Sequence, residues 1–438
     1  MQHNIKSVVI ALLFGLLLPA VSFANMPVAS DGGLQVGDPD GPYWFNLSGV
    51  MKIDERAYTG NTATTSSGVG ALGTYLGGAF IRDAGITLEG GVGENYGYTM
   101  GLDFEAQSKE VKIDEFYLTY YGFGCLMPNF SFSVGQVNPG FCLNCADSSK
   151  WIPFMERNMG TSTFGPKQGM GISANTYNQH YSATVAITQQ PQMGSSVKNV
   201  YGVSRKSPDL WQVSGRFTYA PISQHGKALQ FGFSAHVQEY ANNGLQFKAI
   251  PEMRSGNSTT LLNTTTYYTS NPSPSSGIPN QLWISALNQT TLDADLLGIY
   301  GPWSAELEYQ EVFVTRGMVN GVKQGGDLNF SGFHAQAEYI LTGETRPLKP
   351  SNGTLGQIKP KCKSGAWAVA ARYSFITLND KDIAGGRAYN TTASISWYAN
   401  NNIRVIGEYV YSLQRRQFPT YLDKRHVGGL GARLQVVF

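Results

Sequence analysis

Apolar and polar residues alternate one by one through several long stretches of this sequence. From Trp211 to Tyr219 the chain reads Trp-Gln-Val-Ser-Gly-Arg-Phe-Thr-Tyr. Successive side chains of a β-strand point to opposite faces of the sheet, so this stretch has one apolar face and one hydrated face. The sequence therefore predicts an all-β protein built from amphipathic strands. The same pattern recurs in Tyr98–Glu105, Tyr181–Thr188, Phe231–Gln238 and Phe333–Tyr339.

A soluble β-sandwich alternates in the same way, but three further features favour a transmembrane barrel. The predicted strands run for about 10 residues or more, which exceeds the usual length in soluble proteins and suits a tilted crossing of a bilayer. Aromatic residues such as Tyr43, Tyr219 and Tyr300 lie near strand ends, where interfacial girdles form. The last predicted strand runs to Phe438. Because lipid offers no partners to backbone polar groups, we expect a closed, transmembrane antiparallel β-barrel.

The barrel is expected to have sixteen strands, an even number that places both of its ends on the periplasmic side. Short turns at 93–95, 177–179, 301–302 and 400–402 fall at one end, and the long segments 139–167, 191–209 and 241–287 fall at the other. Segment 342–364 is long but lies at the short-turn end, so a missed hairpin there or in 241–287 would change the count. The strands are expected near residues 43–58, 75–91, 96–107, 111–122, 130–138, 168–177, 180–190, 210–220, 227–240, 288–300, 302–315, 329–341, 365–378, 388–399, 403–415 and 426–438.

The N-terminal segment has the features of a secretory signal peptide. A basic region around Lys6 precedes the apolar run Val8–Leu18 and the small-residue pattern Ser22-Phe23-Ala24. The alternative is a membrane anchor, but the run is about half the ~20 residues that a spanning helix needs. We expect a signal peptide over residues 1–24 and an outer-membrane porin domain over 25–438, surrounded by outer-membrane lipid and lipopolysaccharide.

Composition and histidine placement argue against several other classes. A net charge of +2 gives no broad attraction to nucleic acid. Beyond Ala24 there is no run of about 18 apolar residues, which excludes a helical inner-membrane protein. The six histidines are scattered and none lies in a nucleophile motif, so we expect neither an enzyme nor a bound cofactor. His236 and His334 are interpreted as polar residues of the lumen.

Basic residues on one long loop and on several strands are candidates for the pore lining. Segment 139–167 can fold inward and narrow the pore, where cationic side chains would attract anions; the alternative is that they are solvated on an outer loop. Acidic residues that include Asp103, Glu306 and Glu408 could also line the lumen, which favours a transverse field over a uniformly positive tunnel and leaves selectivity open. The candidate anion contacts are Arg82, Lys150, Arg157, Lys167, Arg216 and Arg372.

Four cysteines in an exported chain suggest that disulfides can form. Cys142 and Cys145 could form a local disulfide or a link between subunits, and Cys125 could pair with Cys362. A zinc site at Cys142 and Cys145 would need further ligands, and no second spaced pair or nearby histidine supplies them. We therefore expect no metal. The sequence does not fix the connectivity.

Several short stretches resemble the phosphate-selective porin O and P family of bacterial outer-membrane porins. The resemblance implies a trimeric, sixteen-stranded channel that selects phosphate-like anions through arginines and lysines along the pore, with Lys150 matching an inward-loop position. Where the family carries Phe-Arg-Arg-Ala-Arg on the second strand, this chain reads Ile-Arg-Asp-Ala-Gly at 81–85, which retains Arg82 alone. The matching stretches are Val134–Phe141, Ser148–Trp151, Glu156-Arg157, Pro251-Glu252, Glu338–Arg346, Gly365–Trp367, Ala371–Ser374 and Leu378–Asp380.

Two functions remain open at this point. The first is a passive channel for small hydrophilic solutes, with an anion preference or none. The second is a surface protein whose long loops 191–209 and 241–287 bind a host or phage while the barrel anchors them. An energised transporter is disfavoured, because the residues between Ala24 and Tyr43 are too few for a plug domain.

Overall fold

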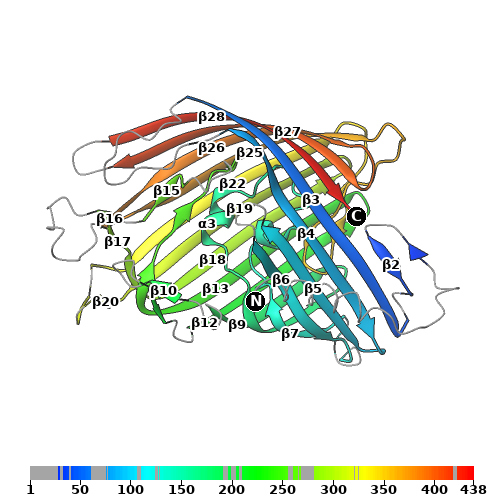
Figure 1. Ribbon diagram of the computed structural model, residues 1–438, viewed down its shortest axis with the longest axis horizontal. Coiled ribbons are helices and arrows are strands. Elements are labelled where there is room, and N and C mark those ends of the chain that lie inside the picture. Colours follow the sequence, from blue (N-terminus) through cyan, green and yellow to red (C-terminus); the bar gives the residue numbers. More distant parts are fainter. Residues whose placement is uncertain are drawn as a thin grey trace, which may run out of the picture.

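The structure is a computed structural model in which sixteen long strands form one closed antiparallel barrel (Figure 1). The barrel closes between the last strand and the first long one, where Val427 pairs with Gly60 and Val437 with Val50. The described residues are 28–29, 33–38, 41–60, 75, 77–105, 110–123, 127, 129–190, 196–198, 204–206, 210–254, 260–264, 266–267, 281–319, 321–323, 325–417 and 422–438.

The predicted number of strands is confirmed, and most predicted boundaries agree within a few residues. The main differences lie at the long-loop end, where β13 runs to Leu245 and β18 begins at Ile284. The barrel strands are β3 (Tyr43–Gly60), β4 (Gly78–Val92), β5 (Tyr96–Glu105), β6 (Glu110–Tyr120), β7 (Ser131–Val137), β8 (Gly169–Tyr177), β9 (Tyr181–Gln190), β12 (Leu210–Gln224), β13 (Lys227–Leu245), β18 (Ile284–Tyr300), β19 (Trp303–Arg316), β22 (Leu328–Ile340), β25 (Ala366–Asp380), β26 (Ile383–Tyr398), β27 (Ile403–Gln417) and β28 (Leu422–Val437).

Two short helices and several short strands complete the described secondary structure. The helices are α2 (Leu143–Ala146) and α3 (Met159–Phe164), and no helix among the described residues is long and apolar enough to cross a membrane. The short strands pair as β1 (Val28–Ala29) with β2 (Leu34–Val36), β10 (Ser196–Lys198) with β11 (Ser204–Lys206), β14 (Lys248–Ala249) with β15 (Leu262–Asn263), β16 (Thr266–Tyr267) with β17 (Gln281–Leu282), β20 (Met318–Val319) with β21 (Val322–Lys323), and β23 (Leu348–Lys349) with β24 (Thr354–Leu355).

The two faces of the barrel wall are inverted relative to a soluble protein. On β12, Trp211 is 51% exposed on the outer face, whereas Gln212 and Arg216 on the inner face are buried. This is the alternation expected of a lipid-facing apolar surface and a polar lumen. Outward apolar side chains recur on every part of the wall, as at Phe231 and Tyr309. The burial pattern therefore agrees with a membrane-embedded barrel.

A loop between β7 and β8 (residues 138–168), called the inner loop below, lies inside the barrel. It carries both helices, and Asn158 caps α3 by accepting a hydrogen bond from the backbone N–H of Thr161 (2.9 Å). Polar wall groups hold the loop in place: Met155 N–H donates to Glu408 (2.7 Å), and Arg404 donates to the carbonyl of Ile152 (2.7 Å). The inward folding predicted for this segment is thus present in the structure.

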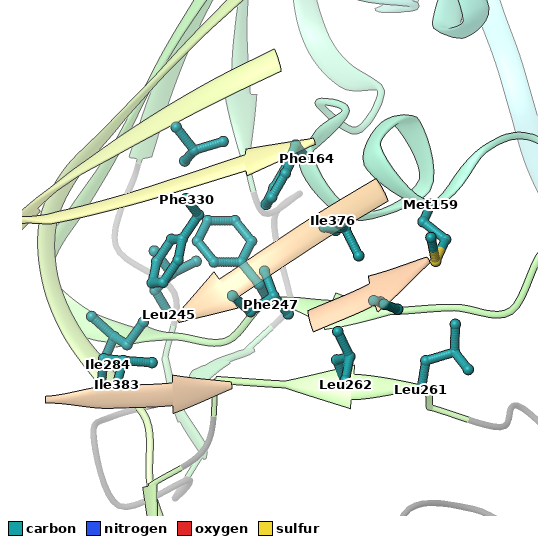
Figure 2. Packing of buried hydrophobic residues seen from close by; sticks show 14 of the residues in the cluster. Met159, Phe164, Leu245, Phe247, Leu261, Leu262, Ile284, Phe330, Ile376 and Ile383 are labelled. Atoms are coloured by element: carbon teal, nitrogen blue, oxygen red, sulfur yellow. The ribbon is translucent and has the colours of Figure 1, made fainter. Parts of the chain in front are cut away.

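An apolar cluster fills part of the barrel behind the inner loop (Figure 2). Phe164 of α3 and Phe330 of the wall both pack edge-on against Phe247, with ring centroids 5.4 and 5.5 Å apart. Phe247 and Leu262 come from the segment between β13 and β18, expected to be an outer loop. That expectation is wrong for residues 246–254 and 260–264, because apolar side chains from both stretches are buried in this cluster.

The segment at 342–364 enters the barrel from the short-turn end. Arg346 donates to Glu338 of β22, and Gln230 of the wall donates to the carbonyl of Gly353 (2.7 Å). The backbone N–H of Leu355 reaches Asp147 of the inner loop (3.2 Å). The segment is long, although it lies at the end with short turns, because it forms structure inside the barrel. Its only strands, β23 and β24, pair with each other, so the number of barrel strands remains sixteen.

Candidate constriction of the channel

Two β-bulges bring adjacent charged residues to the same part of the lumen. Lys52 of β3 pairs with Asp83 of β4, and the next pair joins Ile53 of β3 to Ile81 of β4. Arg82 is therefore an extra residue on β4. On β6, two residues, Asp114 and Glu115, stand between pairs that leave only Gly101 opposite them on β5. A bulge interrupts strict alternation, which allows two neighbouring side chains to reach the lumen. Without it, one charge of each pair would face lipid.

Glu156 of the inner loop is the centre of a cluster of arginines from the wall. It accepts two hydrogen bonds from Arg82, at 2.7 Å from Nε and 2.9 Å from Nη2. Arg56 and Arg433 reach the same carboxylate at 3.0 and 3.4 Å, and Arg254 lies at 3.5 Å. Burial alone would raise the pKa of Glu156, but these guanidinium groups outweigh it and hold the pKa well below its usual range.

Two further carboxylates complete this basic cluster. Asp54 accepts from Arg433 at 2.7 and 2.9 Å and also bonds to Arg56. Asp83 accepts from Lys52 at 2.8 Å. The cluster, comprising Lys52, Arg56, Arg82, Arg254 and Arg433 with Asp54, Asp83 and Glu156, therefore has two more positive than negative groups.

A cavity of about 680 Å³ lies between the inner loop and strands β3 to β6. Six basic and six acidic side chains line it, so its formal charge balances while the two signs are unevenly distributed. The bases gather toward β3, β4 and β28 and the inner loop, and three of the acids lie on β5 and β6. The charged lining residues are Lys52, Arg82, Lys150, Arg157, Arg254, Arg433, Asp83, Asp103, Asp114, Glu115, Asp147 and Glu156.

Three of the six predicted anion contacts line this cavity. Arg82 does so from β4, and Lys150 and Arg157 from the inner loop. Lys150 is half-buried, and its carbonyl accepts from Gln435 of the wall (2.8 Å). The guanidinium of Arg157 donates to the carbonyls of Asn144 (2.8 Å) and Asp147 (2.7 Å), so it also holds the fold of the loop.

The other three predicted contacts are not among the residues that line the cavity. Arg216 is buried on β12 and donates to Asp295 (3.1 Å), and Arg372 is buried against Glu252 (3.0 Å) and over the ring of Phe154. Lys167 is exposed near the end of the inner loop, outside the cavity lining. Arginines that are buried in ion pairs and arginines that remain accessible both occupy inward-facing strand positions. The alternation in the sequence therefore could not separate the two kinds.

Lys52, Arg254 and Arg433 are not among the anion contacts predicted from the sequence. Lys52 and Arg433 lie at inward positions of β3 and β28, so the alternation did carry a signal for them. Arg254 follows Glu252 in the segment that was expected outside the barrel. No periodicity could have placed it, because its position depends on the inward course of that segment.

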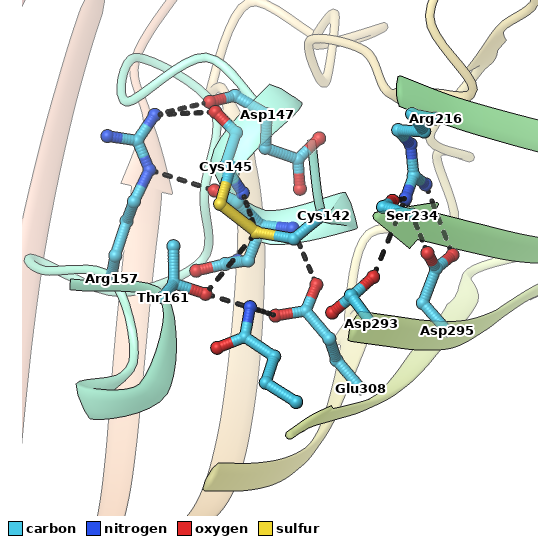
Figure 3. Close-up of a disulfide and its surroundings, with 12 residues drawn as sticks. Cys142, Cys145, Asp147, Arg157, Thr161, Arg216, Ser234, Asp293, Asp295 and Glu308 are labelled. Atoms are coloured by element: carbon cyan, nitrogen blue, oxygen red, sulfur yellow. Dashed lines mark hydrogen bonds and ion pairs between the residues drawn. A yellow bond between two sulfur atoms is a disulfide. The ribbon is translucent and has the colours of Figure 1, made fainter. Parts of the chain in front are cut away.

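Cys142 and Cys145 form a disulfide at the start of the inner loop (Figure 3). Glu308 of β19 braces the same region, accepting from Asn144 N–H (2.9 Å) and from Thr161 (3.0 Å). The local disulfide is thus the pairing present in the structure. Of the other two cysteines, Cys125 lies outside the described residues, and Cys362 is exposed with a free thiol.

One group in the described part of the chain has metal-ligand spacing: Cys142, Asp293 and Glu308, whose ligand atoms lie within 4.8 Å of one another. The sulfur of Cys142 is in the disulfide and offers no thiolate, which is the form that binds metals. Two carboxylates remain, so this group does not form the closed ligand set of a structural metal site.

A closed barrel with an apolar outer face and a charged cavity narrowed by an inward loop defines an outer-membrane porin. The sequence model of the family described as phosphate-selective porin O and P matches residues 76–438, and the chain belongs to this family. Porin O of Pseudomonas aeruginosa is 24% identical to it over 404 residues, which covers 88% of this chain and 87% of that protein.

Solved structures with low sequence identity share the fold. An anion-selective porin from Comamonas acidovorans is 11% identical, with a TM-score of 0.53 over 90% of this chain and 100% of that one. The outer-membrane channel DcaP of Acinetobacter baumannii is 13% identical, with a TM-score of 0.51 over 90% and 97%. The protein is an integral outer-membrane porin that forms a channel for small hydrophilic solutes.

Proposed function

We propose that the channel is passive and has an anion preference set by the basic cluster. The observation that carries this proposal is the excess of two positive groups around Glu156. Of these cations, Arg82 and Arg254 have 25% and 37% of their side chains exposed, so both can touch a passing solute. Cationic groups at a narrow site raise the local concentration of anions and repel cations. The description of the matched family as phosphate-selective and the anion-selective porin of similar fold support the same preference by analogy.

Lys150 is the third accessible cation in this proposal. It lines the same cavity as the basic cluster and the acids of β5 and β6, and no carboxylate within ion-pair distance of it is present among the described residues. An anion that leaves Arg82 or Arg254 therefore has a further positive group available in the same cavity. A sequence of weak sites allows entry and release, which conduction requires.

The remaining features of the proposal concern processing and assembly. Residues 1–24 lie outside the described part of the chain, and we propose that they are removed on export to leave 25–438. The broad apolar outer wall is compatible with a homotrimer embedded among lipid and lipopolysaccharide. A channel without an enzymatic step accounts for the polar lumen residues, including His236 and His334, which are buried in the wall.

Reversal potentials in planar bilayers with a salt gradient test the proposal. The wild-type protein is expected to give a potential of the sign for anion preference, and Arg82→Gln and Arg254→Gln should each reduce it. Lys323→Gln, in an exposed outer turn and not among the residues that line the cavity, is the matched control and should leave it unchanged. A purified, folded protein without ion conductance would contradict the channel, and a cation-selective potential would contradict the anion preference.

A further inference from the structure

The acids on β5 and β6 have no role in a channel that only attracts anions. Asp114 and Glu115 project from the β6 bulge into the same cavity as Arg82 and Lys150. In the described part of the chain, neither carboxylate lies within ion-pair distance of a cation. The side chain of Gln168 can donate to Asp114 (3.2 Å), which leaves its charge uncompensated. This edge of the cavity is therefore a negative pole.

The opposite pole is the basic cluster with its partly exposed groups, Arg82 and Arg254. Each pole depends on a bulge, because a regular β4 or β6 would turn one of the two neighbouring charges outward. The bulges lie two strands apart, on β4 and β6 and separated by β5, which is about 10 Å across the sheet. The cavity thus presents fixed charges of both signs at a separation that one small molecule can bridge.

We infer that the cavity favours zwitterionic solutes whose two charges are several bonds apart, such as ω-amino acids, over uncharged solutes of the same size. The anionic group of the solute lies toward Arg82 and Arg254, and its cationic group toward Asp114 and Glu115. The inference rests on the proposed channel function and names the class of solute that this channel passes best.

Charge balance of the lining explains why a zwitterion is the favoured class. A simple anion is attracted to the basic cluster but repelled by Asp114 and Glu115. A simple cation is attracted to these two carboxylates but repelled by the basic cluster. A zwitterion can place each of its groups beside an opposite charge, which offsets part of the cost of removing both from water. The volume of about 680 Å³ is ample for such a molecule and for water.

Liposome swelling gives the test, because ε-aminocaproate and arabinose carry no net charge and can be compared directly. The ratio of the two entry rates is measured for wild-type protein and for Asp114→Asn/Glu115→Gln. Exposed Asp114 and half-buried Glu115 both act on one ammonium group, so their removal should lower this ratio about fivefold. The double variant Asp327→Asn/Asp382→Asn, in exposed outer turns, removes the same charge and should keep the wild-type ratio.

Arg82→Gln tests the other pole and does not depend on the folding of the first variant. It should also lower the ratio, while gel mobility before and after heating verifies that each barrel is folded. A wild-type ratio matched by both folded pole variants would overturn the inference and leave the channel itself in place. Liposomes that swell with neither solute, together with absent ion conductance, would instead refute the proposed function.

Discussion

Removal of the Glu156 carboxylate is the most informative single change in this channel. Glu156→Gln keeps the size and the hydrogen-bonding oxygen of the side chain but removes the negative charge shared by Arg56, Arg82, Arg254 and Arg433. The excess of positive groups in the basic cluster then rises from two to three. The anion preference should therefore increase, although the mutation lies in the loop and not on the wall.

The magnitude follows from Coulomb's law at the distance of a passing ion. One unit of charge at about 7 Å changes the energy of a monovalent ion by roughly 0.6 kcal/mol in a water-like dielectric and roughly 2.4 kcal/mol at an effective dielectric of about 20. Because this change has opposite sign for an anion and a cation, even the smaller value changes the permeability ratio of chloride to potassium about sevenfold. Reversal potentials in a salt gradient measure this ratio. Asp382→Asn, which removes an exposed charge in an outer turn, is the control.

The same variant has a stability cost and a defined pH dependence. Breaking a buried ion pair on one side costs about 3–5 kcal/mol, because buried Arg56 and Arg433 lose a partner. Since the pKa of Glu156 is lowered in the folded protein, its contribution is present above the unfolded pKa and is lost as pH falls through the folded pKa. The difference in stability between Glu156→Gln and the wild-type protein should thus persist between pH 7 and about pH 5. An unchanged permeability ratio, or a shift toward cations, would refute the reasoning.

Three further changes test the loop and its anchors. Lys150→Glu should lower the anion preference by replacing a positive group of the cavity lining with a carboxylate, and reversal potentials in chloride and phosphate measure it. Glu252→Gln should destabilise the folded barrel by about 3–5 kcal/mol because Arg372 loses its buried partner, visible as a lower temperature for loss of folded gel mobility. Replacing Cys142 and Cys145 with serine should cost about 2 kcal/mol, since the closed loop is short, and unfolding in denaturant should show it.

The barrel was predictable because lipid and water impose opposite demands on neighbouring residues of each strand. Trp211 and Arg216 show this directly, since the first faces outward and the second inward as their positions require. The charge state of the lumen was less predictable. Arg216 and Arg372 have the same inward parity as Arg82, yet their partners Asp295 and Glu252 come from a different strand and from a loop. Which arginine remains accessible depends on tertiary packing, and alternation carries no information about it.

The spacing of apolar residues in the sequence also indicates the two bulges on β4 and β6. Ile81 and Ala84 share the outer face although three positions separate them, and the same is true of Ile113 and Phe116. In a regular strand, residues on one face are two positions apart. Two adjacent charges between outward apolar residues at this longer spacing therefore indicate a bulge. Both poles of the cavity lie at these bulges. The positions where the spacing of outward apolar residues changes from two to three therefore mark the constriction in the sequence.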